Sequence, residues 1–111
     1  MIFLPAKENK YLSGIYIITN TIDSRVYIGE CNNFYKRYGR HRSSLKRNKH
    51  CNKKLQNFVN KYGLDCLKFD ILEIASENLI DLEIQYIKKY NSIENGFNII
   101  LDSRTMKHLS I

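Results

Sequence analysis

The chain has 111 residues, of which 43% are hydrophobic, so it can form one compact domain with its own core and is not expected to be disordered. Its formal net charge of +7 favours a polyanionic partner. Nucleic acid fits this charge better than a membrane does, because no apolar run approaches the roughly 20 residues of a spanning helix. Since no signal peptide is visible either, we expect a cytoplasmic protein. Three widely spaced cysteines without a Cys-x-x-Cys pair predict ordinary thiols rather than a zinc site or disulfides.

Two short segments near the N-terminus are typical of a β-hairpin. Residues 14–18 and 26–29 are rich in β-branched and aromatic residues, and the connection between them carries Asn, Asp and Ser. Each segment holds one tyrosine close to a glycine, Tyr16 and Tyr27, at mirrored places. Tyrosine is common on half-buried strands, but a hairpin that only needed a core would have little use for two phenols there. Residues 1–12 are expected to pack as an arm on the edge of this sheet.

A helix is predicted over residues 34–47, with Asn32 or Asn33 as its N-cap. At about 100° per residue, His41 falls inside the apolar stripe of this helix and Arg37 falls at its margin. Both are oddly placed polar residues and therefore candidates for a functional site.

From residue 36 to residue 54 the chain contains no acidic side chain, whereas a solvated surface usually mixes both signs of charge. The segment therefore favours a phosphate-facing surface. The residues predicted to contact nucleic acid are Lys36, Arg40, Arg42, Lys46, Arg47, His50, Lys53 and Lys54.

The remaining elements complete a small α+β domain. Residues 52–62 predict a second helix with a core-facing stripe, residues 67–74 a third strand, and residues 97–100 a short extended segment after an Asn-Gly turn. A third helix is expected to be capped by Ser76 and to run to about residue 90. The order β-β-α-α-β-α predicts a three-stranded antiparallel sheet flanked by helices.

Glu83 lies within the apolar stripe of the third predicted helix. A carboxylate on a core-facing side should be paired, protonated or bound to a metal ion. The sequence leaves open whether Glu83 is a paired or edge residue or a metal ligand.

These residues together resemble the GIY-YIG nuclease superfamily. The first strand carries Gly-Ile-Tyr ending at Tyr16 and the second Tyr-Ile-Gly starting at Tyr27, with 11 residues from one tyrosine to the other. Arg37-x-x-x-His41 matches the family's helix motif. The match continues with Glu83 on the metal-binding helix and with Asn98 in the closing Gly-Phe-Asn-Ile element. The likeness covers about residues 12–101 and is strongest to the catalytic domains of phage and intron homing endonucleases, in which His50 also has a counterpart.

The resemblance implies a metal-dependent DNA endonuclease that hydrolyses phosphodiester bonds with one divalent cation. Glu83 would hold Mg²⁺ or Mn²⁺, and Arg37 would bind the scissile phosphate. Tyr16 would orient or deprotonate water, with His41 taking the phenolic proton or locking the ring, and Tyr27 would position water or phosphate. Which of the three is the general base stays open.

The resemblance also implies that Asn98 supports Tyr16 or the sheet. We expect residues 1–111 to be a single domain whose residues 102–111 form a tail or the start of a linker. The chain would be the catalytic piece of a longer homing-type enzyme, with a C-terminal or separate DNA-targeting region, or a minimal nuclease. The alternatives are a restriction- or repair-type nuclease recruited by a partner, and a catalytically silent nucleic-acid-binding module.

Overall fold

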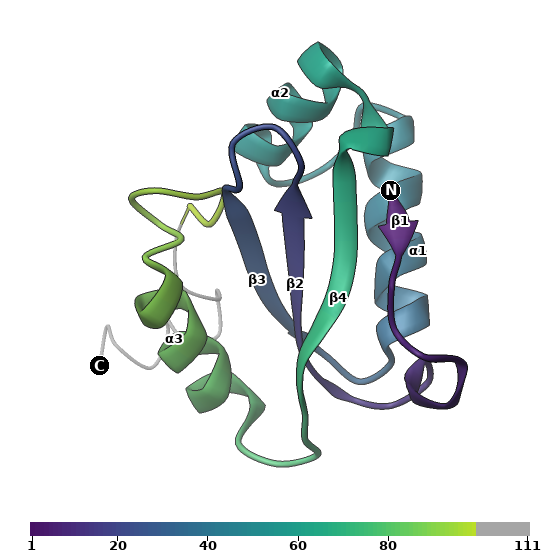
Figure 1. Ribbon diagram of the computed structural model, residues 1–111, viewed down its shortest axis with the longest axis vertical. Coiled ribbons are helices and arrows are strands. Elements are labelled where there is room, and N and C mark those ends of the chain that lie inside the picture. The colour runs from purple at the N-terminus through teal and green to yellow at the C-terminus, as the bar shows by residue number, and fades with distance from the viewer. Residues whose placement is uncertain (100–111) are drawn as a thin grey trace.

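The computed structural model describes residues 1–99, which form a sheet with helices packed on both of its faces (Figure 1). The predicted tail and residue 100 of the last predicted segment lie outside the described residues. In chain order the elements are β1 (Ile2–Phe3), η1 (Lys7–Asn9), β2 (Gly14–Asn20), β3 (Val26–Cys31), α1 (Phe34–Lys46), α2 (Lys53–Tyr62), η2 (Leu64–Cys66), β4 (Leu67–Ile74) and α3 (Leu79–Tyr90), where η marks a short 3-10 helix.

The sheet has four strands in the order β1-β4-β2-β3, so the prediction of three strands is wrong. The additional strand comes from the N-terminal arm, because β1 pairs in parallel with β4 and places Ile2 opposite Lys68. The arm does pack on the edge of the sheet as expected. A strand of two residues is too short to show alternation in the sequence, which is why the pattern did not reveal it. The α+β class and the order of the other elements are confirmed.

The predicted hairpin is formed by β2 and β3, which pair antiparallel with Tyr16 opposite Gly29. Asn20 holds its turn, since its Oδ1 accepts the main-chain N–H groups of Ile22 at 2.9 Å and Asp23 at 2.8 Å. Such bonds from an asparagine side chain to the following backbone are typical of tight turns. Because β2 lies between β3 and β4, its side chains can be positioned by neighbours on both sides.

Of two N-cap residues predicted from the sequence, one is confirmed and one is wrong. Asn33 caps α1, and its side chain accepts the N–H of Lys36 at 2.9 Å. Ser76 does not cap α3, which begins at Leu79 after Asn78. Asn78 has a φ of 56°, a left-handed conformation that asparagine adopts more readily than most residues do. The backbone turn before α3 therefore decides where this helix starts.

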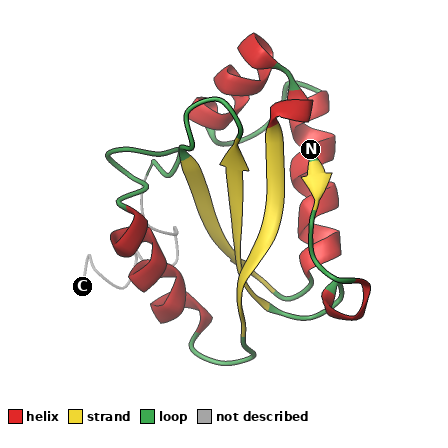
Figure 2. Ribbon diagram, in the orientation of Figure 1, coloured by secondary structure: helices red, strands yellow, loops and turns green. Residues whose placement is uncertain are grey.

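Alternate residues of β2 serve two different layers. Tyr16 and Ile18 pack in a core with residues of α1 and α2, whereas Ile15 packs with Ile87 of α3. Figure 2 shows α3 running beside β3, α1 at the other side of the strands, and α2 across their upper end. Side chains of α1 and of α3 therefore approach the sheet from opposite faces.

The three cysteines, Cys31, Cys51 and Cys66, are free thiols, and Cys31 is the buried one. Among residues 1–99, no helix has the length and apolar character needed to cross a membrane.

Candidate active site

Tyr16 lies across the backbone of Gly29 on the neighbouring strand. A Cβ atom at position 29 would collide with the hydroxyl and the ring of Tyr16, so the side chain of any other residue would displace the phenol. On its other side the Tyr16 ring stacks on Phe69, with 4.8 Å between ring centroids and 15° between planes. The second glycine of the two strand motifs therefore makes the space in which the first tyrosine sits.

The first glycine, Gly14, is explained by the same kind of close approach. A Cβ atom there would collide with the main-chain oxygen of Glu73 on β4 and press on the ring of Phe34. The pairing of β2 with β4 also shifts at this point, since Ile15 lies opposite Glu73 but Tyr16 lies opposite Ile71. Such a β-bulge re-aims the residues that follow it, here Tyr16.

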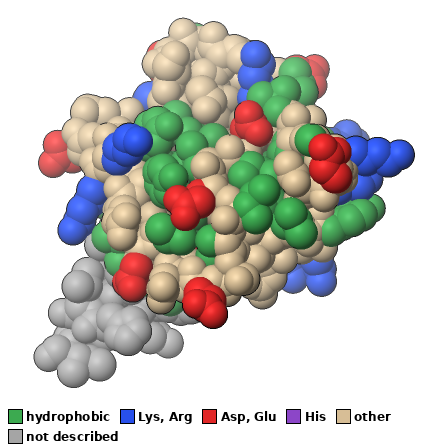
Figure 3. All heavy atoms as spheres, turned by 60° about the horizontal axis from the view of Figure 1, so that its bottom comes forward, with side chains coloured by type: hydrophobic (Ala, Val, Ile, Leu, Met, Phe, Trp, Pro, Cys, Tyr) green, Lys and Arg blue, Asp and Glu red, His purple; other side chains and the backbone are tan. Residues whose placement is uncertain are grey.

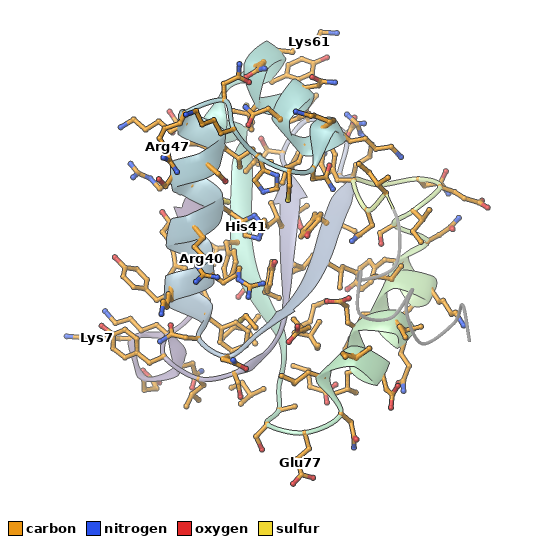
Figure 4. All side chains as sticks on the ribbon, turned by 180° about the vertical axis from the view of Figure 1, so that it is seen from behind. Lys7, Arg40, His41, Arg47, Lys61 and Glu77 are labelled. Atoms are coloured by element: carbon orange, nitrogen blue, oxygen red, sulfur yellow. The ribbon has the colours of Figure 1, made fainter. Side chains whose placement is uncertain are left out.

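A chain of hydrogen bonds runs from Tyr16 into the protein. The Tyr16 hydroxyl lies 2.7 Å from Nε2 of His41, and Nδ1 of His41 lies 2.7 Å from Nε2 of His50. The main-chain N–H of Asn52 then donates to Nδ1 of His50 at 2.9 Å. Figure 4 shows His41 pointing from α1 toward the strands. This confirms that the apolar stripe of α1 directs His41 at the sheet, next to Tyr16.

The structure places His50 in the interior rather than on the predicted DNA-facing surface. Its side chain is 4% exposed, and both of its ring nitrogens are engaged by His41 and Asn52. Its main-chain N–H donates to Oε1 of Gln56 at 3.0 Å. His50 was predicted among the DNA-contacting residues, and composition cannot show that the loop between α1 and α2 turns inward.

Arg37 is half-buried at the edge of the site. Its Nη1 donates to the main-chain oxygen of Glu30 at 3.0 Å, and its positive charge lowers the pKa of the nearby Tyr16 hydroxyl. Arg37 lines a pocket of about 120 Å³ together with Lys36 and Arg40. A guanidinium that is anchored on one side and open to a basic pocket on the other is well placed to receive a phosphate.

Tyr27 brings the second layer into the site. It pairs with Ile18 on the face of the sheet that α1 covers, and its ring centroid lies 6.3 Å from that of Tyr16 and 5.5 Å from that of His41. Burial raises the pKa of Tyr27 to about 12, and the negative charge of Glu83 contributes to this rise. Glu83, on α3, is 4% exposed. Tyr27 therefore contacts the imidazole from one layer and feels the charge of the carboxylate from the other.

Asn98 supports the sheet rather than Tyr16. Its side-chain Oδ1 accepts the N–H of Ile28 at 2.9 Å, and its Nδ2 donates to the oxygen of the same residue at 3.0 Å. The N–H of Phe97 donates to the oxygen of Val26 at 2.9 Å. Residues 97–99, the described part of the predicted extended segment, do not form a strand. The side chain of Asn98 instead pairs with the outer edge of β3 at Ile28, the residue after Tyr27.

Near neutral pH the site contains only uncharged rings, namely those of Tyr16, Tyr27, His41 and His50. Burial raises the pKa of Tyr16 well above its ordinary value; a charge on Tyr27 would raise it further, and Arg37 opposes both effects. Burial lowers the pKa of His41 to about 3, and positive charge on His50 or Arg37 also lowers it. Burial likewise lowers the pKa of His50. A phenolate on Tyr16 therefore depends on cationic or hydrogen-bond-donating neighbours, and Arg37 is the cation that lowers the pKa of this phenol.

Glu83 provides the carboxylate that a divalent cation would need. Within residues 1–99, no group of three or more His, Cys, Asp or Glu side chains is arranged to hold a metal ion unaided. Mg²⁺ binds through one or two carboxylates together with waters and substrate phosphate oxygens. A buried carboxylate whose charge acts on Tyr27 fits that mode of binding.

The predicted DNA-contacting residues other than His50 are all exposed, but they do not form one patch. Lys36, Arg40 and Arg47 line a groove of about 520 Å³ along α1. This groove shares Lys36 and Arg40 with the pocket beside Arg37, so it leads out of the site. Arg42 lies on another side of α1, where its charge acts on the amino group of Met1.

Positive charge is distributed unevenly over the molecule. Figure 4 shows Arg40 and Arg47 along α1 on the side from which His41 is seen, with Glu77 far away at the loop before α3. Figure 3 shows another face, where acidic and hydrophobic side chains share the centre and most Lys and Arg side chains lie toward the outline. The α1 side is therefore the more suitable one for a polyanion.

Two buried polar residues of the site were not predicted, Asn52 and Gln56. They are 7% and 3% exposed, and both hydrogen-bond to His50. Gln56 stands next to Leu55 on the core-facing side of α2, and a polar residue at such a position is the signal that also identified Glu83.

Comparison with known proteins agrees with this geometry. The profile of the GIY-YIG catalytic domain matches residues 12–98. Intron-associated endonuclease 1 of Enterobacteria phage T4 is 38% identical over 89 residues, which cover 78% of this chain and 36% of that protein. Probable intron-encoded endonuclease 1 of Neurospora crassa is 38% identical over 93 residues, covering 77% of this chain and 29% of that protein. The chain spans about a third of the length of these curated relatives.

Two solved structures of the catalytic domain of the intron endonuclease I-TevI share the fold. One is 37% identical, with a TM-score of 0.79 over 83% of this chain and 97% of that one. The other is 38% identical, with a TM-score of 0.75 over 79% of this chain and 98% of that one.

Proposed function

Since the chain belongs to the GIY-YIG family, we propose that it is the catalytic domain of a DNA endonuclease that hydrolyses phosphodiester bonds. The observation that carries the proposal is the meeting of unlike groups around Tyr27. Arg37 and His41 come from α1, Tyr16 from the central strand and Glu83 from α3. A module that only bound nucleic acid would not need a buried carboxylate whose charge acts on the same Tyr27 hydroxyl as the charge of Arg37.

Arg37 and the two phenols would act directly on the substrate. The guanidinium would donate to the scissile phosphate and offset the charge that gathers there in the transition state. Tyr16 and Tyr27 would hold the attacking water by hydrogen bonds, and Tyr16 is the better candidate for the base because Arg37 and His41 both contact its oxygen. Burial of both rings keeps competing bulk water away.

Glu83 would hold one divalent cation, Mg²⁺ or Mn²⁺. When bound, such an ion supplies positive charge to the phosphate and to the departing oxygen. Burial of Glu83 keeps its carboxylate in place for this task, and the phosphate itself would complete the ligand set.

The DNA backbone would leave the site along the α1 groove, where Lys36, Arg40 and Arg47 face the same hollow. Contacts of this kind position a duplex but do not read its sequence. Because the chain spans about a third of its curated relatives, the choice of target would fall to a further DNA-binding region, on the same polypeptide or on a partner.

Nicking of supercoiled plasmid DNA tests the proposal. The unaltered chain should convert supercoiled to open-circular or linear plasmid with Mg²⁺ and not with EDTA. Arg37→Ala should abolish this activity, whereas Arg42→Ala, on the same helix but away from the site, should cut like the parent. DNA binding without any cleavage by the unaltered chain would identify a silent binding module instead. Cleavage that requires an added partner protein would identify the recruited restriction- or repair-type enzyme.

A further inference from the structure

We propose that the main-chain N–H of Asn52 sets the direction of the hydrogen-bond chain through His50 and His41, so that His41 donates to Tyr16 and cannot take its proton. His50 is then a positioning residue for Tyr16. The inference rests on the proposed function for its meaning, since it assigns a role within that site, but its first test requires no cleavage.

The direction starts at a group that can act in one way only. A backbone N–H donates and never accepts, and that of Asn52 lies 2.9 Å from Nδ1 of His50. Nδ1 of His50 must therefore carry a free lone pair and no proton. Burial of His50, which lowers its pKa, keeps the ring neutral, so its single proton resides on Nε2.

That proton determines the state of the next ring. Nε2 of His50 lies 2.7 Å from Nδ1 of His41, and since the first is a donor, the second must be an acceptor. His41 is neutral as well, because burial lowers its pKa to about 3. The proton of His41 is therefore on Nε2, 2.7 Å from the Tyr16 oxygen, and His41 donates to that oxygen.

The consequence for Tyr16 is specific. Its oxygen receives a hydrogen bond from Nε2 of His41 and faces the positive charge of Arg37, so the Tyr16 proton must point away from both, into the space shared with Tyr27. A hydrogen-bond donor and a positive charge beside one phenolic oxygen stabilise its anion. Of the two roles that the sequence left open for His41, this arrangement selects the one that holds the ring and its anion, and excludes the one that accepts the proton.

The starting point of the chain is held rigidly. The Asn52 side chain donates to the oxygen of Phe97 at 2.7 Å and accepts the N–H of Leu55 at 3.0 Å. Oε1 of Gln56 accepts the N–H of His50 at 3.0 Å. These buried bonds fix the loop and the start of α2, and they also tie the His50 anchor to the Asn98 segment that supports β3.

The ring nitrogens of the uniformly ¹⁵N-labelled chain, observed by NMR near neutral pH, test the direction. In the His108→Gln background only His41 and His50 remain to be assigned. Both should show a protonated, pyrrole-type Nε2 and an unprotonated, pyridine-type Nδ1. A proton on Nδ1 of either ring, or a charged ring, would overturn the proposal.

A Tyr16→Phe variant separates the two ends of the chain. If Asn52 sets the direction, both rings should keep their tautomers when the phenolic hydroxyl is removed. If His41 changes to the Nδ1-protonated form, then Tyr16 set the direction and the inference fails.

Replacing His50 links the tautomer to catalysis. Gln can accept from Asn52 and donate to His41, and should retain the plasmid nicking rate within a few-fold. Glu can only accept, so His50→Glu should move the His41 proton to Nδ1 and slow nicking by about 10- to 100-fold, the effect of losing a hydrogen bond to a charged group. Equal rates for Gln and Glu, in chains with equal thermal stability, would contradict the role of His50.

Absence of nicking by the parent chain would refute the proposed function, while the NMR result would still decide the tautomer.

Discussion

Tyr16 on β2 occupies the space that Gly29 leaves open on β3, and a methyl group at position 29 would meet both the hydroxyl and the ring of Tyr16. The two strand motifs are thus two halves of one packing arrangement. Gly29→Ala should displace the phenol, lower the free energy of unfolding by about 1–3 kcal/mol through overpacking, and reduce nicking more than it reduces DNA binding. Urea unfolding together with single-turnover nicking would measure both effects. A variant with unchanged stability and rate would show that Tyr16 has room to move.

Gly39→Ala is the matched control on α1, and it makes a prediction of its own. Among residues 1–99, and apart from the adjacent residues and backbone of α1 itself, no atom lies within 4 Å of the position that a Cβ would take there, so alanine should be accommodated. Removing a glycine from a helix interior should raise the free energy of unfolding by about 0.5–1 kcal/mol. A loss of stability in thermal or urea unfolding would contradict the open environment of this position.

Asn98→Ala should destabilise the outer edge of the sheet. The substitution leaves the buried N–H and C=O of Ile28 without the partners that Asn98 supplies, which costs about 1–3 kcal/mol for each unpaired group. Hydrogen exchange should show faster exchange at the amide of Ile28. Asn57→Ala, at an exposed position of α2, is the control and should leave exchange at Ile28 unchanged.

The α1 groove predicts a change in the salt dependence of DNA binding. Lys36→Ala and Arg40→Ala should each weaken binding to a duplex and reduce the slope of log K against log salt by about 0.9 for each phosphate that the protein no longer neutralises. Arg42→Ala should change neither, because Arg42 lies on another side of the helix. Equal effects of all three substitutions in fluorescence anisotropy would indicate diffuse attraction rather than a defined backbone path.

Stability should fall as the solution is made acidic, because the buried histidines resist protonation. His41 has a pKa of about 3 in the folded chain against 6.5 ordinarily, so between these values the unfolded chain binds a proton that the folded chain does not. The free energy of unfolding should therefore decrease with falling pH, by up to about 1.4 kcal/mol per pH unit for each such histidine. Well above pH 6.5 the His41 ring is neutral in both the folded and the unfolded chain, so its contribution to the slope vanishes.

Urea unfolding between pH 5 and 6.5, where most carboxylates remain ionised, would isolate this slope. In His41→Gln the slope should be smaller. An unchanged slope would mean that His41 is protonated in the folded chain.

Much of the site could be predicted because its residues break local patterns. His41 and Glu83 are polar residues within apolar stripes, and Tyr16 and Tyr27 are mirrored phenols beside glycines, so each position is anomalous in sequence alone. The structure confirms the hairpin and the Asn33 cap, since both depend on neighbours along the chain.

The features that the sequence did not reveal depend on distant parts of the chain. Strand β1 exists because Ile2 pairs with Lys68, and two residues carry no period. His50 was predicted to contact DNA at the surface, whereas it is buried and hydrogen-bonded to Asn52 and Gln56. Burial of a polar loop is decided by partners that come together only on folding.

The nicking rate of Glu83→Gln, compared with that of Glu77→Gln, tests most directly whether the groups that meet at Tyr27 form one catalytic site. Glu77 is exposed before α3, and its variant should bind and cut plasmid DNA like the parent. Glu83→Gln removes a buried charge but keeps the shape, so it should bind DNA as the parent does and cut at least about 100-fold more slowly at saturating Mg²⁺. Cleavage by Glu83→Gln at the parent rate would contradict a catalytic role for this carboxylate.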